Sequence, residues 1–70
     1  MMIMEIGIVA GDIWHYLDEN GNVALEDLIK GIDKPRNLVL MGLGWLAREG
    51  HVSVENSDGS RVSLRKKDLL

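Results

Sequence analysis

The sequence predicts a mainly helical α+β domain built from three helices and a C-terminal two-stranded β-hairpin. Apolar residues recur at helical spacing over residues 4–20 and 35–50, which predicts two long helices. After Gly50 the pattern changes to alternation of apolar and polar residues, which predicts strands. A chain of 70 residues has room for one hydrophobic core.

The composition favours a cytoplasmic protein whose stability comes from packing. The chain has no cysteine, which excludes disulfide bonds and thiolate metal sites. The N-terminal stretch is rich in apolar residues, but Glu5 and Asp12 interrupt it well short of the ~20 apolar residues that a membrane span needs. We therefore expect no membrane segment.

Charge is divided unevenly along the chain. Residues 1–29 hold six acidic side chains and no Lys or Arg, whereas residues 30–70 hold all 8 basic residues against five acidic ones. The net charge is −3. A basic C-terminal half is compatible with a polyanionic partner, but an acidic chain is a poor non-specific binder of nucleic acid.

Residues 4–20 are predicted to form the first helix, which ends at Asn20-Gly21. Its buried face comprises Ile6, Val9, Ala10, Ile13 and Leu17. Its far face is also apolar, because it carries Met4, Ile8 and two glycines that allow another helix to approach closely. This second face needs a partner, unless the first turns of the helix fray as chain termini often do.

A short second helix is expected over residues 25–30, after a strand stub at residues 22–24. Its buried side is formed by Leu25, Leu28 and Ile29. Gly31 ends this helix, and residues 31–33 form a tight turn into the third helix. The two helices and their turn make a helix-turn-helix arrangement.

The third helix, residues 35–50, has apolar residues on two opposite faces. Asp33 is expected to cap its first turn, and Gly50 is expected to end it in a left-handed conformation. The inner face comprises Val39, Gly42, Leu43 and Leu46. The outer face comprises Asn37, Leu38, Met41, Gly44, Trp45 and Arg48. Because a surface helix needs only one apolar stripe, the outer one must be covered by this chain or by another molecule.

Residues 52–64 predict a hairpin whose register follows from its faces. One face comprises Val52, Val54, Val62 and Leu64. A two-residue turn at Asp58-Gly59 would put the faces out of phase, whereas a three-residue loop at 57–59, with Gly59 left-handed, brings them together. This loop pairs Val54 with Val62, Val52 with Leu64, and Glu55 with Arg61.

This order of elements is that of a winged helix-turn-helix domain, and three stretches carry a family resemblance. They are Ala10-Gly11-Asp12-Ile13-Trp14, Tyr16-Leu17 and Leu43-Gly44-Trp45-Leu46-Ala47-Arg48-Glu49-Gly50. Here the sequence resembles a small bacterial and archaeal winged helix-turn-helix family catalogued as a domain of unknown function. The resemblance covers residues 6–64 and implies this fold and homodimers, with no established activity. We assign residues 1–64 to one domain and residues 65–70 to a short charged tail.

The sequence offers no pattern typical of a catalytic or metal site. His15 and His51 lie on different elements, and neither has the neighbouring Cys, Ser or ligands that nucleophilic or zinc chemistry needs. His15, Asp18 and Glu19 share one exposed helical turn, where three flexible side chains make a poor metal site. We therefore expect a non-enzymatic protein without a cofactor.

We expect a homodimeric interaction or regulatory module. Burying a tryptophan is worth about 3 kcal/mol, a gain that a protein surface offers and a hydrated DNA groove largely does not. The expected interface residues on the third and first helices are Leu38, Met41, Trp45, Arg48, Met4 and Ile8. The alternative for Trp45 is packing under the wing or against the first helix of its own chain.

The alternative function is that of a DNA-binding transcriptional regulator. The third helix would then enter the major groove, and the basic C-terminal half would contact phosphates. The residues for this function are Arg36, Asn37, Arg48, Arg61, Arg65, Lys66 and Lys67. Against it, the wing tip carries Asp58, whose carboxylate is repelled by phosphates.

Overall fold

The computed structural model describes residues 2–56 and 59–65, with side chains from Glu5 onward. The elements are α1 (Met2–Asn20), β1 (Val23–Ala24), α2 (Leu25–Gly31), α3 (Arg36–Arg48), β2 (Val52–Glu55) and β3 (Arg61–Leu64). Three helices and a small antiparallel sheet confirm the predicted α+β winged helix-turn-helix fold.

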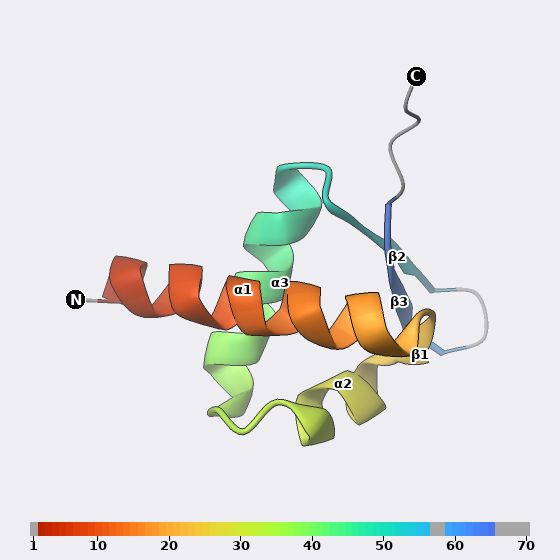
Figure 1. Ribbon diagram of the computed structural model, residues 1–70, viewed down its shortest axis with the longest axis horizontal. Coiled ribbons are helices and arrows are strands. Elements are labelled where there is room, and N and C mark those ends of the chain that lie inside the picture. Colours follow the sequence, from red (N-terminus) through yellow and green to blue (C-terminus); the bar gives the residue numbers. More distant parts are fainter. Residues whose placement is uncertain (1, 57–58, 66–70) are drawn as a thin grey trace.

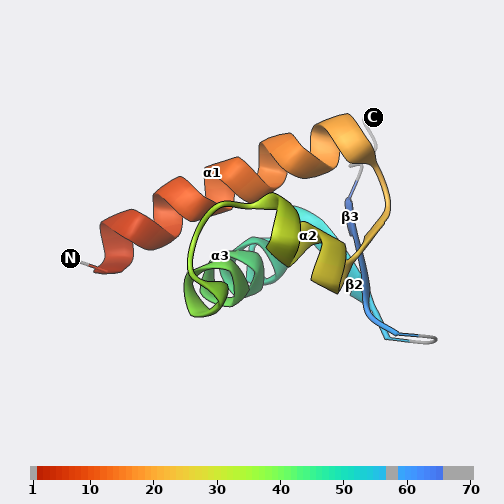
Figure 2. The same cartoon turned by 90° about the horizontal axis from the view of Figure 1, so that it is seen from below.

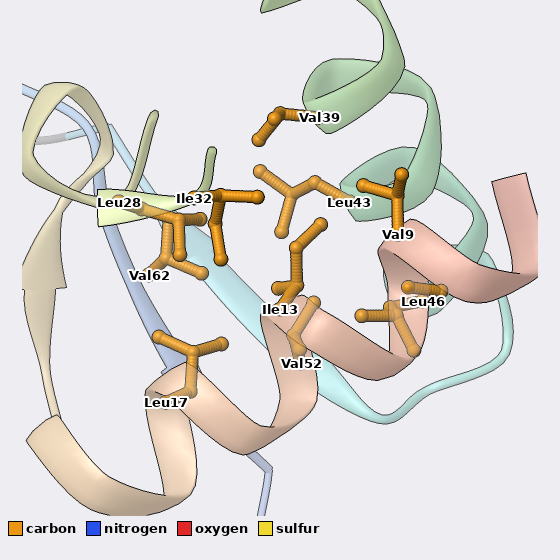
Figure 3. Packing of buried hydrophobic residues seen from close by; sticks show 11 residues of the cluster. Val9, Ile13, Leu17, Leu28, Ile32, Val39, Leu43, Leu46, Val52 and Val62 are labelled. Atoms are coloured by element: carbon orange, nitrogen blue, oxygen red, sulfur yellow. The ribbon is translucent and has the colours of Figure 1, made fainter. Parts of the chain in front are cut away.

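One core holds these elements together. α1 crosses α3, and the sheet lies at the C-terminal end of α1 (Figure 1). Buried side chains from the three helices, the turn after α2 and two strands meet in one cluster, much of it seen in Figure 3: Val9, Ala10, Ile13, Leu17, Leu28, Ile32, Val39, Leu43, Leu46, Val52 and Val62. The predicted inner faces of the first and third helices are therefore confirmed, with Ile6 half-buried at the margin.

The predicted glycines mark the C-terminal ends of the two long helices, but the predicted cap at the start of α3 does not form. Gly21 and Gly50 have φ of 77° and 80°, a conformation that favours glycine. The Asp33 cap is wrong: α3 begins at Arg36, and no side chain caps it. The reason is Pro35, whose carbonyl accepts hydrogen bonds from the amides of Leu38 and Val39 at 3.0 and 3.1 Å, so that the first turn starts beyond the reach of Asp33.

The sheet contains the predicted hairpin and one strand more. The register Val52–Leu64, Val54–Val62 and Glu55–Arg61 is confirmed. The strand stub β1 pairs with β3, so that the sheet has three strands in the order β1-β3-β2. Gly59 has the predicted positive φ, 87°, whereas Ser57 and Asp58 of the predicted loop lie outside the described residues.

Candidate interaction surface

The outer face of α3 carries large side chains that the core does not cover. Trp45 is 49% exposed and Met41 is 36% exposed, and Arg48 and Asn37 are exposed beside them. Leu38 differs, because it is partly buried against the core. The predicted apolar face therefore exists, with Leu38 at its inner edge.

The N-terminal half of α1 forms the second part of the surface. α1 extends past α3 at its N-terminal end (Figures 1 and 2). Ile8 is 56% exposed here. A Cβ built on Gly7 or Gly11 would meet nothing within 4 Å. The side chain of Met4 lies outside the described residues.

Two open hollows flank the crossing of α1 and α3. One, of about 390 Å³, is lined by Glu5, Ile8, Val9, Lys34, Pro35 and Leu38. The other, of about 300 Å³, is lined by Gly7, Ala10, Gly11, Trp14, Trp45, Leu46 and His51. The structure thus brings Ile8 and Leu38 together in the first hollow and places Trp45 in the second.

Trp14 belongs to this surface although it is absent from the predicted interface. It is 39% exposed, lines the same hollow as Trp45, and its ring stands edge-on to that of His15 with centroids 5.7 Å apart. Trp14 lies at the edge of the buried face of its helix, and this position is the feature of the sequence that could have indicated its place on the surface. Trp45 lies beside α1 but does not complete the core, because about half of it stays exposed.

The basic residues assigned to DNA binding are only partly free. Arg36 donates two hydrogen bonds of 3.1 Å to the carboxylate of Glu26. Arg61 donates to Asn22, at 2.7 Å to Oδ1 and 3.1 Å to the carbonyl. Arg48, Asn37 and Arg65 are exposed, whereas Lys66 and Lys67 lie outside the described residues. Of the predicted set, the structure thus leaves Asn37, Arg48 and Arg65 exposed and holds Arg36 and Arg61 in hydrogen bonds.

The Arg36–Glu26 pair has an electrostatic consequence. The hydrogen bonds from Arg36, and then its positive charge, lower the pKa of Glu26 below its ordinary value of 4.5. The same contact raises the pKa of Arg36, which stays charged. Both side chains are more than half exposed, so the pair contributes little to stability.

Replacement of Arg36 by glutamine is expected to return the pKa of Glu26 towards its ordinary value. The lowered pKa means that the pair stabilises the folded chain above the pKa of the unfolded state, and that this contribution disappears as pH falls through the lower folded pKa. A carboxyl titration by NMR measures the shift directly. An unchanged Glu26 titration in the variant would show that the two side chains do not pair in solution.

The described residues hold neither a metal cluster nor a membrane helix. Within residues 2–56 and 59–65, no group of three or more His, Cys, Asp or Glu side chains is placed to hold a metal ion. No helix in the same part of the chain is long and apolar enough to cross a membrane.

Comparison with known proteins identifies the family. A family model described as a winged helix-turn-helix domain (DUF2582) matches residues 1–65. The chain is 40% identical over 57 residues to an uncharacterised protein of Methanocaldococcus jannaschii, covering 77% of this chain and 80% of that one. Its structure is similar to the solution NMR structure of a protein of Bacteroides thetaiotaomicron, with a TM-score of 0.79 and 28% identity, covering 91% of this chain and 79% of the other.

Winged helix-turn-helix domains are DNA-binding or regulatory modules and are typically not enzymes. With its three helices, its three-stranded sheet and its matched family model, the chain belongs to the winged helix-turn-helix domain family DUF2582.

Proposed function

We propose that the protein is a non-enzymatic regulatory module that self-associates through the outer face of α3 and the N-terminal half of α1. The observation that carries this proposal is the half-exposed Trp45, which lies with Met41 on the outer face of α3, while Ile8 is 56% exposed on α1. Exposed large apolar side chains of this kind are typical of protein interfaces, and tryptophan is enriched among the residues that dominate their binding energy.

DNA binding has less support from the same residues. Arg36 and Arg61 are engaged by Glu26 and Asn22, so that contacts with phosphate require these hydrogen bonds to be given up. The face of α3 that would enter the major groove presents Met41 and Trp45 to base edges, which offer mainly polar groups. We therefore favour a protein partner on this face.

Met41→Asp is expected to convert a wild-type dimer into a folded monomer, because the interface would then bury an unpaired carboxylate. Sedimentation equilibrium measures the mass, and circular dichroism checks that the variant stays helical. Leu40→Asp is the matched control, since Leu40 is 39% exposed on the same helix but lies outside the outer face. It should remain dimeric.

A wild-type monomer at high micromolar concentration would contradict the proposal. DNA binding then becomes the function to measure, by electrophoretic titration of mixed genomic fragments at low salt. A DNA complex weakens steeply as salt rises, whereas an apolar dimer is insensitive to salt or strengthened by it. Salt dependence therefore separates the two functions.

A further inference from the structure

We infer that two copies pack reciprocally, with the N-terminal half of α1 from each copy lying on the outer face of α3 of the other. This inference rests on the proposed self-association and specifies which surfaces meet. A symmetric dimer that uses these helices has three arrangements: α1 on α1, α3 on α3, or α1 on α3 twice. Shape, area and charge favour the third arrangement.

The shapes of both surfaces allow a close approach. The N-terminal half of α1 projects beyond α3 (Figures 1 and 2), so a second molecule can reach it without displacing any part of the fold. Gly7 and Gly11 on α1, and Gly44 on the outer face of α3, all have open space where a Cβ would lie. A helix backbone can therefore come close to either surface.

The area that a stable dimer needs favours a contact formed twice. A standard interface removes about 800 Å² from each partner, about a sixth of the 4829 Å² surface of this chain. One crossing of α3 on α3 uses only the outer face of that helix. Reciprocal packing uses both the α3 face and the α1 projection of each copy, so that Ile8, Met41 and Trp45 are all covered.

Charge distinguishes the three arrangements most clearly. α1 carries only acidic charged residues. Glu5 is exposed on its projecting half, whereas Asp12 lies further along the helix, where it is paired with Lys34 at 3.2 Å. α3 carries only basic ones, Arg36 and Arg48, and Arg36 is held by Glu26. Packing α1 on α1 therefore brings acidic groups together, and packing α3 on α3 brings Arg48 towards the partner's Arg48. Only reciprocal packing sets Glu5 against the partner's Arg48.

A charge exchange between two variants tests the arrangement. Arg48→Glu alone and Glu5→Arg alone should each weaken self-association about tenfold or more, because each creates a like-charge contact that occurs twice in the symmetric dimer. An equimolar mixture of the two variants should regain the wild-type dissociation constant, since the mixed dimer then has two attractive contacts, one Glu–Arg contact as in the wild type and one with its direction reversed. Sedimentation equilibrium measures the constants, and native mass spectrometry of isotope-labelled chains identifies the mixed dimer.

Glu19→Arg is the matched control. It makes the same exchange of charge on an exposed residue of α1 but at the opposite end of the helix, and it should leave the dissociation constant unchanged. Circular dichroism of each variant checks the fold, because a basic residue near the start of α1 opposes the helix dipole.

The outcomes separate this inference from the proposed function. A wild-type monomer overturns both. If the wild type is a dimer but the mixture binds no more tightly than either variant alone, only reciprocal packing is overturned. If Arg48→Glu instead pairs preferentially with the wild type, and Glu5→Arg dimerises as the wild type does, α3 packs on α3.

Discussion

Replacement of Ile13 by alanine is expected to lower the free energy of unfolding by about 2 to 5 kcal/mol, with a value in the upper half of that range. Ile13 is fully buried and lies in the middle of the core cluster near Leu43 and Val52 (Figure 3). Truncation removes buried methyl groups and leaves a cavity that three separate elements would have to close. A domain of this length has a total stability of roughly 4 to 10 kcal/mol, so the loss is a large part of it.

Urea denaturation followed by circular dichroism measures this change as a shift in midpoint. The protein concentration must be kept fixed, because a self-associating chain gains stability with concentration. Leu40→Ala is the control: its side chain is 39% exposed, and its removal should cost less than about 1 kcal/mol. Equal losses at the two positions would contradict the core as described.

The features that could be predicted from the sequence are those that repeat at a fixed period. Helical spacing alone selected Val9, Ile13 and Leu17 as one face, and all three are buried. Hairpin register followed in the same way, because only one loop length brings Val54 opposite Val62. In both cases the side-chain period leaves one arrangement that buries the apolar residues.

The features that could not be predicted depend on contacts between distant residues. Arg61 and Asn22 are 39 positions apart, and they meet because β1 pairs with β3. The hollow shared by Trp14 and Trp45 depends on the angle at which α1 crosses α3, which no local pattern fixes. The sequence therefore indicated an exposed apolar face on α3, but it did not show that α1 adds a second tryptophan or that Glu26 engages Arg36.

Gly42→Val is expected to lower the free energy of unfolding by about 3 kcal/mol or more, because it would push α1 away from α3. A Cβ at this position would lie 3.2 Å from the backbone nitrogen of Ala10 and 3.3 Å from side-chain carbons of Ile13 and Val9. The backbone nitrogen cannot turn aside as a flexible side chain would, so α1 itself has to move. Valine then adds two methyl groups at the contact between α1 and α3.

Gly44→Ala should instead raise the free energy of unfolding. Gly44 lies two residues further along α3, where an added Cβ meets nothing within 4 Å, and alanine is favoured over glycine within a helix by up to about 1 kcal/mol. Both substitutions are best measured in the Met41→Asp background, so that the proposed self-association does not contribute to the stability. Because the two glycines share one helix and differ mainly in the face they occupy, a loss at Gly42 and a gain at Gly44 would assign the close contact with α1 to the inner face of α3. Stabilisation at both positions would mean that α1 does not rest on Gly42.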